Sequence, residues 1–218
     1  MIRNVILDWS GTLVDDLPAV WQATNFVLRQ AGVPELSLEQ FRAEFSLPYL
    51  DFYRRYTPHL EIGRLEAWFY AHFRQVEDSV VELAHAREFL VFCRERGLVT
   101  LLLSTVPYQH YVVQAARLGF DQYLDHPYLG VVDKRAKIHE ILATHHLDPL
   151  ATVFVGDMQH DIETAQHGGI VSCAVLTGYN SLEQLRASKP NLIVEHLGEL
   201  QRILDHNNYE LHGDRPRQ

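Results

Sequence analysis

Two acidic segments that lie far apart in the chain could form one catalytic site. Asp8 follows directly on the apolar run 5–7, and Asp157 follows the run 153–155, with Asp161 four residues later. Apolar runs that end in a carboxylate are typical of buried strands that deliver an acidic side chain to the edge of an α/β sheet, where ligands collect. Converging carboxylates would bind a hard divalent cation such as Mg²⁺, which commonly bridges protein carboxylates and a phosphate. Either aspartate alone could simply accept the backbone N–H groups of its turn.

Hydroxyl and amino groups between the two acidic segments could contact the same phosphate. The apolar run 101–103 ends in Ser104 and Thr105, and Lys134 opens an amphipathic helical segment. A hydroxyl can donate to a phosphoryl oxygen, and a lysine can neutralise one and keep a nucleophilic carboxylate ionised. Because each group follows a predicted strand or opens a predicted helix, the set favours phosphate chemistry over isolated turn and surface roles.

These segments resemble, in order, the motifs of the haloacid dehalogenase-like hydrolase superfamily, in its phosphoglycolate-phosphatase-like branch. The resemblance covers about residues 1–204. The segments that carry it are residues 8–15 (DWSGTLVD) for the first motif, Ser104 for the second, Lys134 for the third, residues 156–161 (GDMQHD) for the fourth, and residues 162–169, 178–180 and 190–200 for the parts that follow.

The resemblance implies a Mg²⁺-dependent phosphatase that acts on a small phosphorylated metabolite. Asp8 would attack the phosphoryl group and form an aspartyl-phosphate, which water then hydrolyses. The metal would be held by Asp8, by the backbone carbonyl of Ser10, by Asp157, and by Asp161 either directly or through water.

The resemblance also implies which groups hold the phosphoryl oxygens. Ser104 and Lys134 would bind them, and Lys134 is preferred over Lys137 because of its distance upstream of Asp157 and its place at the start of a helix. Further substrate contacts are expected from Thr105 and from the backbone N–H groups of Trp9 and Gly11.

Ser10 departs from the family's pattern, because phosphatases of the family carry a carboxyl group there that protonates the leaving alcohol and then activates water. A serine hydroxyl cannot perform that transfer near neutral pH, and a positioned general acid/base contributes ~10²–10⁴ in rate. Two functions therefore remain. One is a phosphatase of modest activity, in which another group such as Asp16, His59 or His72 supplies the proton or the leaving group is good enough not to need one. The other is a catalytically impaired protein that binds a phosphate ligand and signals through closure of its cap.

Substrate choice in this family comes from the cap, and phosphoglycolate-like small acids are the expected substrates. Arg54 and Arg55 lie in a Tyr-rich helical segment, residues 49–56, and could bind a second carboxylate or phosphate. Arg42 and Arg64 are further candidates. An amphipathic surface helix is the simpler interpretation of this segment, so the two readings stay open at this point.

The pattern of elements predicts an α/β fold, a Rossmann-like doubly wound parallel sheet with a small, inserted, all-helical cap domain. The predicted core comprises residues 1–15 and 85–204, the cap residues 16–84, and a polar, frayed tail residues 205–218. Strands are expected at 99–104, 153–156, 171–176 and 191–194 besides the first. Cap helices are expected at 17–31, at 49–56, at 62–76 and after the capping box 37–40. The cap junctions near 15–18 and 80–86 are candidate hinges.

Composition narrows the class of protein further. The 218 residues are 47% hydrophobic and 22% charged, which suits one core with a satellite domain. A net charge of −9 argues against nucleic-acid binding, and neither a membrane-spanning stretch nor a signal-peptide pattern is recognisable. Cys93 and Cys173 lie in apolar contexts without metal-ligand spacing, which favours free thiols and a cytoplasmic location. The expected partner is a small-molecule phosphate ester, and the expected state is a monomer or homodimer.

Overall fold

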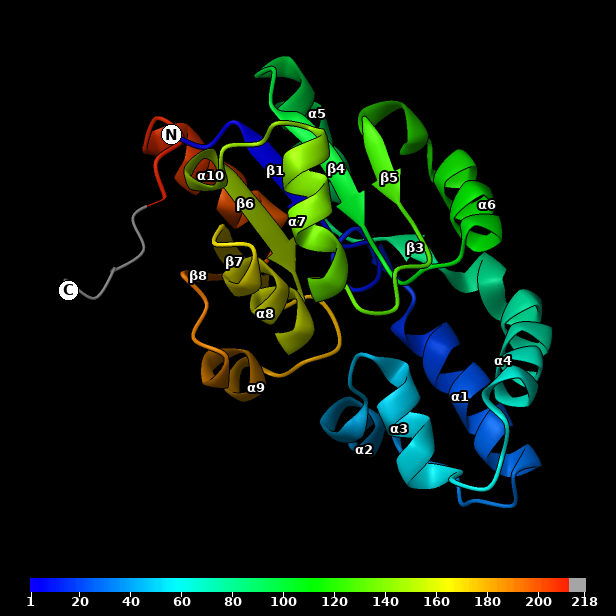
Figure 1. The fold of residues 1–218 in the computed structure, drawn as a ribbon. Helices are drawn as coiled ribbons and strands as arrows, with labels where there is room; N and C mark the ends of the chain where they lie inside the picture. Colours follow the sequence, from blue (N-terminus) through cyan, green and yellow to red (C-terminus); the bar gives the residue numbers. More distant parts are fainter. Residues whose placement is uncertain (212–218) are drawn as a thin grey trace.

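A parallel sheet forms the centre of the computed structural model, which describes residues 1–211 (Figure 1). Its strands lie in the order β5-β4-β1-β6-β7-β8, and each pair of neighbours is parallel. The strands are β1 (Asn4–Leu7), β4 (Val99–Leu103), β5 (His126–Tyr128), β6 (Thr152–Gly156), β7 (Val171–Val175) and β8 (Leu192–Val194). The predicted α/β class is confirmed, and β5 is a short strand that the sequence did not indicate.

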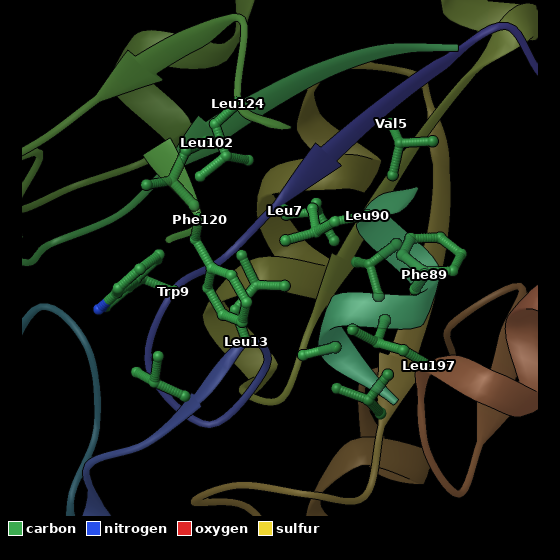
Figure 2. Packing of buried hydrophobic residues seen from close by; sticks show 14 of the residues in the cluster. Val5, Leu7, Trp9, Leu13, Phe89, Leu90, Leu102, Phe120, Leu124 and Leu197 are labelled. Carbon is green, nitrogen blue, oxygen red and sulfur yellow. The ribbon is translucent and has the colours of Figure 1, made fainter. Parts of the chain in front are cut away.

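Alternation along the strands places a separate apolar layer on each face of the sheet, because successive side chains of a strand point to opposite faces. Val5 and Leu7 of β1 belong to the larger cluster, together with residues of α5 (Ala86–Glu95), α6 (Tyr108–Leu118) and α10 (Leu197–His206). Figure 2 shows this cluster from close by. Ile6 points to the other face and packs with α7 (Arg135–Thr144) and α8 (Gln159–His167).

Four helices between β2 and β3 form the inserted helical region. Figure 1 shows them beyond the carboxyl ends of the sheet strands. They are α1 (Leu17–Gln30), α2 (Leu38–Glu44), α3 (Tyr49–Tyr56) and α4 (Ile62–Val76), close to the predicted bounds. Ser37 and Gln40 form the predicted capping box at the start of α2. The division into a core and a cap with the stated boundaries stays a prediction.

The two junctions of this insertion lie side by side and are paired. β2 (Val14–Asp15) pairs antiparallel with β3 (Val81–Glu82), and the amide of Leu83 donates to the carbonyl of Leu13. The expectation that residues 16–84 hold no strand is therefore wrong at its end, because β3 forms only through this long-range pairing. The remaining elements are α9 (Leu182–Ala187) and the 3₁₀ turns η1 (Glu77–Ser79), η2 (Asp121–Tyr123) and η3 (Pro149–Ala151).

The C-terminal end is ordered further than expected. Helix α10 continues to His206, and the carbonyl of Tyr209 accepts the amide of Ile2. Residues 212–218 of the predicted tail lie outside the described residues. Within residues 1–211, no helix is both long and apolar enough to cross a membrane.

Candidate active site

Three carboxylates meet at the carboxyl edge of the sheet. Asp8 follows β1 and Asp157 follows β6, and these strands are direct neighbours in the sheet. Asp161 comes from the first turn of α8, and one carboxylate oxygen of each residue lies within 4.8 Å of the other two. Helix α8 begins at Gln159, so Asp157 lies just after the end of β6 and Asp161 lies in the first helical turn.

A buried lysine side chain joins two of these carboxylates. The Lys134 ammonium lies 2.9 Å from Asp8 Oδ2 and 2.7 Å from Asp161 Oδ1, and all three side chains are buried. The Lys134 amide donates to His160 Nε2 at 3.1 Å, which fixes the backbone just before α7. Burial lowers the pKa of His160 to about 4, so this nitrogen stays an acceptor. The structure thus brings Lys134 to Asp8, whereas Lys137 forms an ion pair with Glu140.

The charge balance of the cluster suits a divalent cation. Burial raises the pKa of Asp8, against the lowering effect of the Lys134 ammonium, and burial together with the charges of Asp161 and Asp8 raises the pKa of Asp157 well above its usual value. Burial disfavours the charged form of Lys134, but its carboxylate neighbours prevail and raise its pKa. Three buried carboxylates beside one ammonium form an oxygen-rich donor set that a hard cation would both fit and neutralise.

Asp157 is held from two sides by neighbouring loops. Its Oδ2 accepts the Tyr179 amide at 2.7 Å, and its Oδ1 accepts the Thr12 hydroxyl at 3.3 Å. Gly11 and Gly178 both approach this carboxylate so closely that a Cβ atom on either would overlap it. Gly11 also has φ +68°, which favours glycine. The two glycines therefore let the loops close around Asp157.

The groups predicted to contact the phosphoryl oxygens differ in whether they are free to do so in this structure. Thr105 lines the cavity next to Asp8, while the buried Ser104 hydroxyl accepts the amide of Val106 at 3.3 Å. The Trp9 amide donates to Asp8 Oδ1 at 2.7 Å. The Gly11 amide donates to the Val14 carbonyl at 2.8 Å, so the expectation that it binds a phosphoryl oxygen is not supported, because the turn itself uses this donor.

Ser10 contacts a carboxyl group, that of Asp16, which is one of the three candidate proton donors named from the sequence. Its hydroxyl donates to Asp16 Oδ2 at 2.6 Å, and the Tyr179 hydroxyl donates to Asp16 Oδ1 at 3.0 Å. Burial raises the pKa of Asp16 to about 7, against the lowering effect of these two hydrogen bonds. Ser10 and Asp16 both line the cavity that contains Asp8. The side chain of His72 stacks on Phe26 instead.

This cavity lies between the carboxyl edge of the sheet and the inserted helices. Its wall is mostly aromatic and apolar, and no lysine or arginine is among the described residues that form it. The lining residues are Asp8, Ser10, Asp16, Val20, Thr24, Phe45, Leu47, Tyr49, Tyr53, Glu66, Phe69, Tyr70, Phe73, Thr105, Val106, Pro107, His110, Met158 and Tyr179.

The arginines proposed as substrate ligands do not line it. Arg54 is exposed and pairs with Asp51 at 2.9 Å. Arg55 is also exposed and donates to the carbonyl of Glu44. Both lie outside the cavity in this structure, because α3 directs its aromatic residues inward and its arginines to solvent, and a role in substrate binding stays a prediction. Arg64 lies over the Trp68 ring.

Arg42 joins the inserted helices to the core. Its guanidinium donates to the carbonyls of Gly178 at 2.8 Å and Tyr179 at 3.0 Å. The same loop holds Asp157 through the Tyr179 amide. Arg42 therefore couples the position of α2 to the position of Asp157.

A buried network of hydrogen-bonded side chains behind the site was not predicted. The Trp9 indole donates to Gln114 Oε1 at 2.7 Å, Gln114 Nε2 donates to Glu77 Oε1 at 3.0 Å, and the same oxygen lies 2.8 Å from His110 Nδ1. The network links the turn after β1, helix α6, and η1, which lies next to β3 at the second junction of the insertion. Its members lie up to 105 residues apart, so no local pattern could have revealed it.

Comparisons with known proteins agree with this geometry. A family model described as haloacid dehalogenase-like hydrolase matches residues 5–175. The chain is 26% identical to a phosphoglycolate phosphatase of Synechococcus elongatus, over 89% of this chain and 93% of that protein. It is also 26% identical to a 5'-nucleotidase of Pseudomonas aeruginosa, over 93% and 95% of the two chains.

Solved structures show the same fold at low sequence identity. A haloacid dehalogenase-like family hydrolase from Streptococcus pneumoniae superimposes with a TM-score of 0.81 at 20% identity, covering 93% of this chain and 98% of that one. A hydrolase from Pseudomonas syringae gives a TM-score of 0.82 at 15% identity, covering 94% and 98%.

Proposed function

The chain belongs to the haloacid dehalogenase-like hydrolase family, and we propose that it is a Mg²⁺-dependent phosphatase that uses Asp8 as its nucleophile. The observation that carries the proposal is the convergence of Asp8, Asp157 and Asp161 beside a cavity that Asp8 lines, with the Lys134 ammonium paired to Asp8 and Asp161. The substrate is a phosphate monoester small enough for that cavity.

Asp8, Asp157 and Asp161 would hold the metal, with the backbone carbonyl of Ser10 as a further ligand. Bound there, Mg²⁺ supplies positive charge that neutralises the carboxylates and the phosphate oxygens. The Lys134 ammonium, 2.9 Å from Asp8 Oδ2, favours the ionised form of Asp8 and opposes the effect of its burial. The ionised oxygen is the form that can attack phosphorus.

In the first step an Asp8 oxygen bonds to phosphorus, and the bond from phosphorus to the ester oxygen breaks. With Asp16 protonated, its carboxyl O–H would donate to Ser10 Oγ across the same 2.6 Å contact. The leaving oxygen then takes a proton from the Ser10 hydroxyl while Ser10 takes one from Asp16, which is left as a carboxylate. In the second step a water oxygen bonds to phosphorus and the bond from Asp8 to phosphorus breaks. Inorganic phosphate and the Asp8 carboxylate are released, and the Ser10–Asp16 pair accepts the proton of the water. The Asp16 carboxyl group thus acts as the general acid and base through Ser10, a role that the Ser10 hydroxyl alone could not fill.

The inserted helices act as a cap in this proposal. Residues 16–84 would close over the core, residues 1–15 and 85–204, and closure would exclude water from the transferring phosphoryl group. The paired strands β2 and β3 provide two adjacent crossing points at which such a motion could occur. The arginine of α2 that binds the 178–179 carbonyls supports a link between closure and the metal site.

The competing function is a binder of phosphate ligands that uses cap closure as a signal. The serine at position 10 favours it, since this residue lacks the carboxyl group that the reaction needs. The hydrogen bond from Ser10 to Asp16 argues against a purely ligand-binding function, because it brings a buried carboxyl group into contact with position 10.

The experiment is turnover of p-nitrophenyl phosphate with and without Mg²⁺. The wild-type chain should release phosphate only with the metal, and Asp8→Asn should abolish turnover while the protein still folds. Asp205→Asn, which removes a carboxylate from an exposed pair with Arg96, is the matched control and should keep full activity. Full turnover by Asp8→Asn, or in excess EDTA, would refute the mechanism.

A further inference from the structure

The chemistry of the cavity wall narrows the substrate class. Beyond the carboxylate cluster, the wall consists mainly of aromatic rings contributed by the inserted helices, among them Tyr49 and Tyr53 of α3 and Phe69 and Phe73 of α4. Aromatic rings bury large apolar areas and pack well against another ring. The surface that a leaving group would touch is therefore apolar.

The charged groups on this wall are acidic. Glu66 accepts the Tyr49 hydroxyl at 2.6 Å, and Asp16 accepts the hydroxyls of Ser10 and Tyr179. His110 also lines the cavity, and its Nδ1 lies 2.8 Å from Glu77 Oε1, so Glu77 already occupies this ring nitrogen. No lysine or arginine among residues 1–211 contributes to the lining. A second anion on the substrate would meet carboxylates without a cation to pair with, and burial of an unpaired charge is costly.

Resting on the proposed phosphatase function, we infer that the substrate is a phosphate monoester whose leaving group is uncharged and apolar, and that it carries no second acidic group. The wall from α3 and α4 binds this leaving group while the carboxylate cluster and Lys134 hold the phosphoryl end. Phosphoglycolate, whose second end is a carboxylate, fits this wall poorly, although a relative named phosphoglycolate phosphatase shares 26% identity with the chain.

The test compares benzyl phosphate with 4-carboxybenzyl phosphate, which share a ring and an alkyl leaving oxygen and differ by one charge. We expect kcat/KM for benzyl phosphate to exceed that for its carboxylate by at least ~10-fold, and to exceed that for phosphoglycolate as well. Glu66→Gln should narrow the benzyl to carboxybenzyl ratio several-fold. Glu61→Gln, an exposed position on the cap outside the cavity, should leave the ratio unchanged.

Equal or faster turnover of either carboxylate substrate would overturn the inference, and so would a ratio that Glu66→Gln leaves unchanged. Binding of benzylphosphonate and 4-carboxybenzylphosphonate, measured by calorimetry with Mg²⁺, asks the same question without chemistry. Tighter binding of the uncharged compound supports the inference, and tighter binding of the carboxylate contradicts it. Failure of the phosphatase proposal is separate, since it appears as the absence of Mg²⁺-dependent phosphate release from every ester.

Discussion

Exchanging the two residues of the Ser10–Asp16 pair tests the proton path directly. Three variants are needed: Ser10→Asp, Asp16→Ser, and the double variant that carries both changes. The double variant keeps one hydroxyl and one carboxyl group within the same contact, which is 2.6 Å between oxygens in the wild-type chain. Ser10→Asp alone places two carboxyl groups in contact. Because their negative charges repel each other, the pKa of one of them rises and that group stays protonated.

The magnitude follows from the role assigned to Asp16. Loss of a positioned general acid costs ~10²–10⁴ in rate, and the lower end corresponds to about 2.7 kcal/mol at 1.36 kcal/mol per decade. The Tyr179 hydroxyl still lies beside position 16 and can order water there, so we expect Asp16→Ser to lose ~10² with an alkyl phosphate. The double variant should recover at least ~10-fold of this loss.

The assay compares phosphate release from benzyl phosphate and from p-nitrophenyl phosphate. An unprotonated alkoxide leaves poorly and p-nitrophenolate leaves well, so Asp16→Ser should affect the first substrate far more than the second. Glu66→Gln removes a different carboxyl group from the same cavity and should leave the sensitivity to leaving-group pKa unchanged. Thermal melts check folding of every variant.

Two results would refute this reasoning. One is full activity of Asp16→Ser towards benzyl phosphate when the chemical step is rate-limiting, because another group must then donate the proton. The other is a folded double variant that is no faster than Asp16→Ser. In that case a carboxyl group at either position does not serve the leaving oxygen, and the ligand-binding function gains weight.

Three further predictions concern the stability of the cluster and of the core. Lys134→Met should destabilise the metal-free protein by about 3–5 kcal/mol, because it leaves buried carboxylates without their cation. Mg²⁺ should restore part of the lost stability, as measured by chemical denaturation. An unchanged denaturation midpoint without metal would contradict the role of the ion pairs. Saturating Mg²⁺ at ~100 times Kd should stabilise the wild-type chain by about 2.7 kcal/mol, and Asp157→Asn should lose this gain while Asp205→Asn keeps it, as read from melting temperatures. Cys93 and Cys173 should not react with a disulfide reagent at pH 8 until the protein unfolds, because burial raises the pKa of Cys93 to about 12 and that of Cys173 further, so the reactive thiolate is absent; rapid labelling of the native protein would disprove this.

The framework of the site follows from the amino-acid sequence. Each run of apolar residues that ends in a carboxylate marks a buried strand, and parallel strands share one carboxyl edge, so Asp8 and Asp157 were expected at the same edge of the sheet. The pairing of β1 with β6 then makes them neighbours. Helix bounds were also local properties. The capping box at Ser37 and the apolar spacing of residues 62–76 predict α2 and α4 without reference to the rest of the chain.

The pairing of the side chains around that framework depends on tertiary packing and could not be predicted from local patterns. The Asp16 carboxyl meets the Ser10 hydroxyl because the turn after β1 folds back on itself, and Tyr179, which binds the same carboxyl, comes from 163 residues away. Arg54 and Arg55 face solvent because the aromatic residues of α3 take the inward face. Sequence spacing fixes which residues share a helical face, but which face meets the core depends on the packing of distant elements. That packing lines the cavity beside Asp8 with aromatic and acidic side chains and leaves Arg54 and Arg55 outside it.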